Sequence, residues 1–179
     1  MKKILAVALL STFVAAPSFA ADTGAYISAD LGSATLKNAA PFPDPGVISF
    51  GAGYRFSPNI AAELGYTFFG DSKITSGSNW LTMKLSSLHP AVVGTLPVND
   101  QFSVFGKFGL AINSEKYTSN LTLSTSSYSQ NSTYFAFGGQ YNLNQQLGMR
   151  VQYESFGDFD NVPPPYSATA VSVGIVYNF

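Results

Sequence analysis

Apolar residues occupy every second position along much of this chain, and this alternation constrains the fold more than any other feature. Residues 47–56 place Ile48 and Phe50 in one register and Ser49 in the other, and the pattern resumes in residues 60–69. Successive side chains of a β-strand point to opposite faces. The two segments therefore predict a β-hairpin with one apolar face and one face of small or polar residues.

The same alternation predicts further strands. They fall at residues 25–32, 102–112, 135–143, 147–154 and 171–179. One more strand, near residues 85–96, is needed to keep the hairpins in pairs, which brings the predicted total to eight. Pro90 lies inside it and lacks the N–H group that a sheet requires. We therefore expect a β-bulge or a register shift at Pro90.

The face opposite the apolar one decides between two all-β folds. A soluble β-sandwich alternates as well, but its outward face is rich in water-loving residues. Here that face is built from Gly, Ala and Ser, and only 11% of all residues are charged, against about 25% in soluble domains. Strands embedded in lipid must close into a barrel because no backbone group can stay unpaired. The sequence thus predicts an all-β fold, an eight-stranded antiparallel up-and-down transmembrane β-barrel, and the sandwich is the alternative.

The N-terminus has the layout of a cleavable signal peptide. Two lysines precede an apolar stretch at residues 4–16, and small residues follow before Ala20. We expect cleavage between Ala20 and Ala21, so that residues 1–20 are the signal peptide and residues 21–179 the barrel domain. Cleavage leaves seven basic and ten acidic residues, a net charge of −3. This balance argues against nucleic acid as a partner.

The connections alternate between short and long. Short turns are predicted at residues 57–59, 97–100 and 144–146, and long loops at residues 33–46, 70–81, 114–132 and 157–167. Short periplasmic turns and longer extracellular loops are typical of outer-membrane barrels. An even number of strands then places both termini in the periplasm. Because Ser, Thr and Asn predominate in residues 117–132, we predict a flexible exposed loop there.

Several segments resemble the OmpA-like outer-membrane β-barrel family. They are Arg-Phe-Ser-Pro-Asn-Ile-Ala-Ala-Glu-Leu-Gly-Tyr at 55–66, the turn and strand at 96–109, Phe-Gly-Gly-Gln-Tyr at 137–141 and Met-Arg-Val-Gln-Tyr at 149–153. The C-terminal Tyr177-Asn178-Phe179 is similar to the signal by which the outer-membrane assembly machinery recognises such chains. The resemblance implies an isolated barrel domain, without the peptidoglycan-binding domain of OmpA. It also implies the outer membrane of a Gram-negative cell, with lipid and lipopolysaccharide as partners.

Ionisable residues on the small, polar register are the candidate site. They are Glu63, Lys107 and Arg150, with Asp30, Arg55 and Glu154 in the same register and Gln140 as an uncharged neighbour. Glu63 and Arg150 each lie four residues from a short turn, so they can meet across the lumen. The resemblance implies a salt-bridge network that closes the lumen, and Gln140 stands where those barrels commonly have a carboxylate. Since buried charges must be paired, we favour a structural network over a gate.

Two other candidates are weaker. Ser87 and His89 share a face, but Ser-Leu-His reverses the His-x-Ser order of lipid A deacylases, and no orienting acid is evident. Asp158 and Asp160 are two carboxylates in a loop, too few ligands for a calcium site. We therefore expect no enzyme activity, no cofactor and no metal site.

These patterns favour a structural and surface-interaction role in the cell envelope. The predicted extracellular loops are where a host, phage or matrix ligand would bind. A narrow porin-like channel for ions or small solutes is the alternative, and a lipid-modifying enzyme is the third hypothesis.

Overall fold

The computed structural model describes residues 23–39, 43–76, 79–119, 125–159 and 166–179. The expected signal peptide and its cleavage point between Ala20 and Ala21 lie outside these residues. No helix in the described part of the chain is long and apolar enough to cross a membrane.

The described residues form nine β-strands. Their bounds are β1 Gly24–Lys37, β2 Gly46–Ser57, β3 Ile60–Phe69, β4 Ser72–Ser76, β5 Asn79–Pro97, β6 Phe102–Ser119, β7 Thr125–Asn142, β8 Leu147–Asp158 and β9 Ser167–Asn178.

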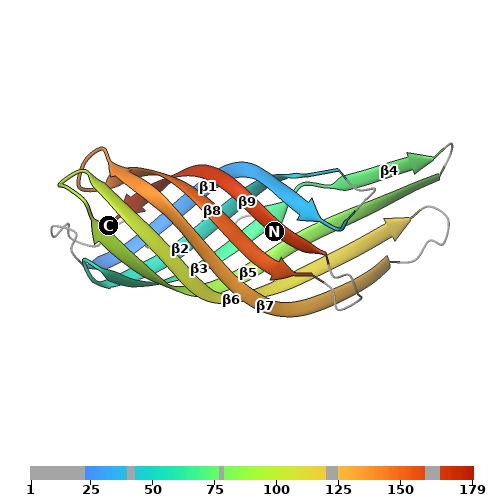
Figure 1. The fold of residues 1–179 in the computed structure, drawn as a ribbon, viewed down its shortest axis with the longest axis horizontal. Helices are drawn as coiled ribbons and strands as arrows, with labels where there is room; N and C mark the ends of the chain where they lie inside the picture. The colour runs from blue at the N-terminus through green and yellow to red at the C-terminus, as the bar shows by residue number, and fades with distance from the viewer. Residues whose placement is uncertain (1–22, 40–42, 77–78, 120–124, 160–165) are drawn as a thin grey trace, which may run out of the picture.

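The strands close into one antiparallel barrel (Figure 1). The order around the wall is β3-β2-β1-β9-β8-β7-β6-β5-β4, and pairing of β3 with β5 closes the ring. β3 and β4 follow each other along the same edge of β5. Where they meet, the five residues from Phe68 to Ser72 face the four residues of β5 from Ser86 to Met83, which marks a bulge. Because β3 and β4 fill one position, the predicted eight-stranded antiparallel barrel is confirmed.

The barrel has two unlike ends. Three connections of two to four residues, between β2 and β3, β5 and β6, and β7 and β8, lie at what we call the short-turn end. At the opposite, long-loop end, the β4–β5 and β6–β7 pairs project beyond the rest of the wall (Figure 1).

These projections correct the prediction of a flexible loop at residues 117–132, of which residues 120–124 lie outside the described part of the chain. β6 continues to Ser119 and β7 begins at Thr125, with partners such as Glu115 and Tyr128 in register. Thr, Tyr and Ser pair well across strands. Beyond the apolar wall, both faces of β6 and β7 carry polar side chains. The alternation of apolar and polar residues therefore disappears although the strands continue.

Pro90 also behaves differently from the prediction. The pairing of β5 with β6 runs from Leu88↔Ile112 to Ala91↔Gly109 without a change of register, and the β3 side is continuous through Leu64↔Pro90. The expected bulge or register shift is therefore wrong. Gly109 accommodates the proline, since a Cβ atom there would lie 2.0 Å from the Pro90 carbonyl oxygen.

The two registers separate outside from inside as the alternation predicts. Large apolar side chains are exposed around the outer wall, for example Leu31, Phe50, Leu64, Phe108 and Val173. Buried side chains fill the interior in two apolar clusters, a small one near the short-turn end and a larger one near the long-loop end. Charged side chains lie between these clusters.

Candidate functional site

Glu63 and Lys107 form a buried ion pair inside the barrel. Lys107 Nζ donates to Glu63 Oε1 at 2.6 Å, and the Tyr26 hydroxyl donates to Glu63 Oε2 at 2.9 Å. The two charged side chains are only 2% and 3% exposed. Both lie on the inward register of their strands, β6 and β3.

Arg150 on β8 makes a bidentate ion pair with Asp30 on β1. Its Nε donates to Asp30 Oδ1 at 2.8 Å and its NH2 to Oδ2 at 2.7 Å, while NH2 also donates to the Ser28 hydroxyl. Its NH1 lies 3.4 Å from Glu63 Oε2, which links the two pairs. A Cβ atom at Gly174, the partner of Asp30 on the neighbouring strand β9, would lie 2.2 Å from Asp30 Oδ1, so the glycine makes room for this carboxylate.

Asp30, Glu63, Lys107 and Arg150 are called the ion cluster below. It holds two carboxylates and two cations, so its formal charges balance, as buried ions require. It draws one residue each from β1, β3, β6 and β8, and therefore ties four separate parts of the wall together across the lumen.

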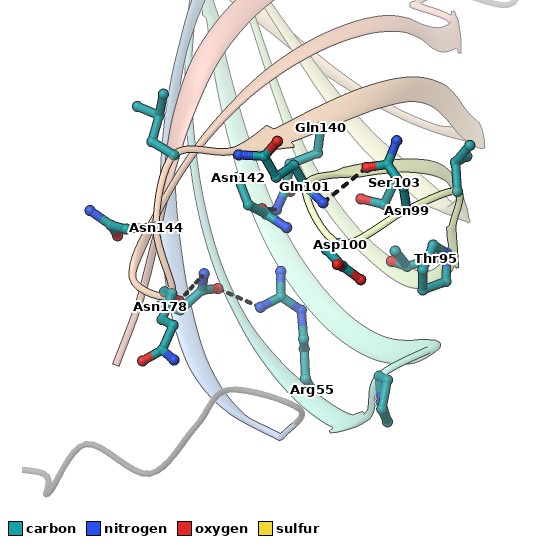
Figure 2. A pocket seen from close by; sticks show the side chains of 15 residues that line it. Arg55, Thr95, Asn99, Asp100, Gln101, Ser103, Gln140, Asn142, Asn144 and Asn178 are labelled. Carbon is teal, nitrogen blue, oxygen red and sulfur yellow. Dashed lines mark hydrogen bonds between the residues drawn. The ribbon is translucent and has the colours of Figure 1, made fainter.

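The structure does not bring Arg55 and Gln140 into the ion cluster. Both lie at the short-turn end, in a polar hollow of about 780 Å³ (Figure 2). Arg55 donates to the Asn178 side-chain oxygen, and Gln140 donates to Asn142 Oδ1 at 2.7 Å. These side chains share the register of the ion cluster but not its depth along the barrel.

Glu154 lies deeper, on the long-loop side of Arg150, and makes no ion pair within the described residues. The Tyr134 hydroxyl donates to Glu154 Oε1 at 2.8 Å, and the Ser172 hydroxyl donates to Oε2 at 3.2 Å. Its neighbour Gln152 is 2% exposed, and its amide group has no hydrogen-bond partner in the described structure.

His89 and Ser87 do not form a catalytic pair. His89 Nε2 lies 3.0 Å from the Thr67 hydroxyl, which in turn lies 2.8 Å from the Ser49 hydroxyl. The Ser87 hydroxyl has no hydrogen-bond partner among the described residues. The imidazole instead stacks on Tyr134, with ring centroids 4.4 Å apart.

Aromatic side chains fill the lumen on the long-loop side of the ion cluster, and sequence reasoning singled out only His89 among them. This aromatic cluster comprises Phe69, His89, Tyr134, Phe156, Phe159 and Tyr166. Tyr134 and Phe156 are completely buried. Both continue the inward register, from Ala136 and from Glu154, so extending that register by one step would have found them.

The remaining candidates are dispersed. Asp160 lies outside the described residues, while the Asp158 carbonyl accepts hydrogen bonds from Asn113 and Ser132. No group of three potential metal ligands occurs in the described part of the chain. Near the C-terminus, the Phe179 amide donates to the Ala25 carbonyl at 3.1 Å, and its ring packs edge-on against Tyr177.

Comparison with known proteins identifies the kind of barrel. A family model described as the outer membrane protein beta-barrel domain matches residues 6–179. No curated protein sequence matches the chain.

Solved structures share the fold at low sequence identity. Neisserial surface protein A is 18% identical, with a TM-score of 0.70 over 87% of this chain and 97% of that chain. Ail, the attachment invasion locus protein of Yersinia pestis, is 16% identical, with a TM-score of 0.63 over 88% and 99%. The N-terminal β-barrel domain of Pseudomonas aeruginosa OprF is 11% identical, with a TM-score of 0.57 over 88% and 99%. At these identities the likeness concerns the fold alone.

Proposed function

Because this chain belongs to the outer membrane protein beta-barrel domain family, which confirms the OmpA-like resemblance, we propose that it is a closed, non-conducting barrel with a role at the cell surface. In this proposal the short-turn end faces the periplasm and the long-loop end faces outward, as in outer-membrane barrels generally. The exposed apolar wall then contacts lipid.

The filled lumen is the observation that supports a closed barrel. The ion cluster crosses the lumen at one depth, and the aromatic cluster fills it at the next. In an eight-stranded barrel the interior is just wide enough for side chains to fill. An ion crossing this lumen would have to displace both layers, so the structure favours the closed barrel over the narrow channel.

Planar-bilayer recording tests this proposal. We expect no steady unit openings from the wild-type barrel, and none from Glu63→Gln, because the aromatic cluster remains in place. Steady openings of the wild type would contradict the proposal, and an amplitude that changes in Glu63→Gln would show that the current passes by the ion cluster. A porin of known conductance, prepared in the same way, is the positive control.

The surface role rests on the two strand pairs that project at the long-loop end. Each is a hydrogen-bonded pair of strands that carries polar side chains beyond the apolar wall. Ail, which shares the fold, has been solved in complex with the heparin analogue sucrose octasulfate. We propose that this chain likewise contacts a host, phage or matrix partner through the projecting pairs.

We also propose that residues 1–20 direct export and that the C-terminal strand serves assembly. Tyr177 in β9 and Phe179, which follows the strand, have packed aromatic rings. Deleting Phe179 should lower the amount of folded protein in the outer membrane several-fold, whereas Phe179→Tyr should leave it nearly unchanged. Fractionated membranes and heat-dependent gel mobility measure this, and normal levels after the deletion would contradict it.

A further inference from the structure

Three lysines lie on the outward face of β4, β5 and β6 near the long-loop end. Lys84 and Lys116 are direct cross-strand partners, and Lys73 lies opposite Thr82, two residues from Lys84. All three lysines are exposed, while Met83, next to Lys84, is buried in the interior. The alternation of the strand thus fixes these lysines, called the lysine patch, on the outer wall.

The lysine patch gathers most of the positive charge outside the lumen. Of the seven basic residues after residue 20, Arg55, Lys107 and Arg150 point inward. The other four lie at the long-loop end, three of them in the patch. The fourth, Lys37 at the end of β1, lies opposite Ser167 rather than another lysine.

The patch has more positive than negative charge. Lys84 Nζ lies 2.9 Å from Asp71 Oδ2, and about half of each side chain is exposed. Lys116 pairs with no carboxylate in the described part of the chain. Like charges directly opposite each other on neighbouring strands are destabilising. An anion held between Lys84 and Lys116 would relieve this repulsion.

The depth of the patch matches a lipid headgroup layer. Phe68, an exposed aromatic residue, pairs with Ser86, and Lys84 lies two residues farther along β5. Two residues span about 7 Å of strand, or about 5 Å along the barrel axis at a tilt of about 40°. Each headgroup region extends about 5–8 Å beyond the hydrocarbon. Flexible lysine side chains at this depth reach lipid phosphates readily.

Trp80 lies four residues beyond Lys84 on β5 and contacts a lysine of the patch. Lys73 Nζ lies 5.3 Å from the centre of the Trp80 ring. Trp80 is also the single tryptophan of the chain, so its fluorescence reports directly on the patch.

We propose that the lysine patch binds the phosphorylated sugar headgroup of lipopolysaccharide in the outer leaflet, with a phosphate held between Lys84 and Lys116. Lysine is a compact point charge suited to phosphate. This proposal rests on the proposed function, because it needs the long-loop end to face outward.

Titration of lipopolysaccharide into the folded barrel in zwitterionic detergent, followed by Trp80 fluorescence, tests the patch. The double substitution Lys84→Gln/Lys116→Gln should raise the midpoint about tenfold or more, in line with the known contribution of lysines at anionic surfaces. Lys84→Arg/Lys116→Arg should keep the midpoint within about twofold, since it preserves the charge. Asp71→Asn should lower the midpoint, because a competing carboxylate is removed from Lys84.

The matched control is Lys37→Gln, which removes one exposed lysine at the same end of the barrel. An equal shift in Lys37→Gln and Lys116→Gln, or no shift in the double variant, would overturn the proposal. The same fluorescence change with millimolar inorganic phosphate alone would also overturn it, because the site would then be one for free anions. A heat-dependent gel shift shows that each variant is folded. If the wild type showed no such shift, the proposed outer-membrane barrel would be contradicted, and the lysine patch would not be the cause.

Discussion

Lys107 is the residue whose loss should disturb the interior most. It is the nearest cation to Glu63, at 2.6 Å, while Arg150 reaches the same carboxylate only at 3.4 Å and is held mainly by Asp30. Lys107→Met should therefore lower the free energy of unfolding by about 3–5 kcal/mol, the usual effect of leaving a buried charge without its partner. Urea unfolding from lipid vesicles measures this.

The double variant Glu63→Gln/Lys107→Met is the control for this prediction. It removes both charges together and leaves the Arg150–Asp30 pair intact, so most of the lost stability should return. Equal stability of the Lys107→Met single variant and the wild type would show that the ion pair contributes little.

At the same scale, the sequence predicts which face a charge occupies more readily than its depth. Register places Arg55 and Gln140 on the inward face, and both do point inward, but they lie within two residues of a strand end, in the hollow of the short-turn end. Glu63 and Arg150 lie four residues from their turns and meet. Depth must be counted from the turn, and the stagger between tilted strands then decides which residues share a layer.

Among the strands, β5 and β6 provide the sharpest test of close packing. A Cβ atom at Gly109 would lie 2.0 Å from the Pro90 carbonyl oxygen and 2.7 Å from Ala91 Cα, both backbone atoms that cannot turn aside. Gly109→Ala should therefore cost about 1–3 kcal/mol of stability. The fraction of protein that shows heat-dependent gel mobility after refolding should fall as well.

Gly94, on the same strand pair, provides the matched control for Gly109→Ala. A Cβ atom there meets nothing within 4 Å, so Gly94→Ala should change stability by no more than about 0.5 kcal/mol. Similar losses in both variants would contradict the close approach of Pro90 as the cause, because Gly94 has no such neighbour.

The predicted strands match the structure best where one face is apolar and exposed. There the apolar register is continuous, and the hairpin at residues 47–69 matches β2 and β3 closely. Beyond the apolar wall, β4 and the outer parts of β6 and β7 have polar residues on both faces, so hydrophobic periodicity has nothing to detect. Hydrogen bonding between neighbouring strands holds these parts together, and pairing of this kind is not encoded in a single strand.

For the molecule as a whole, the division between wall and projections implies that the two can be separated. The ion and aromatic clusters are built from residues inside the barrel, and none of these residues falls within positions 118–125 of the chain. Tyr117 and Ser126 are Cα partners, so an Asn-Gly turn can join them in place of residues 118–125. We expect this shortened protein to keep its heat-dependent gel mobility and its urea midpoint nearly unchanged.

Shortening the β4–β5 pair in the same way provides the comparison, because Ile74 and Leu81 are also Cα partners and accept the same Asn-Gly turn. Cells that carry the wild type or either shortened barrel can be compared for phage adsorption and for adhesion to host cells. If the surface role is correct, at least one shortened barrel loses binding while remaining folded in the outer membrane. Unchanged adsorption and adhesion in both would contradict a role for the projecting pairs.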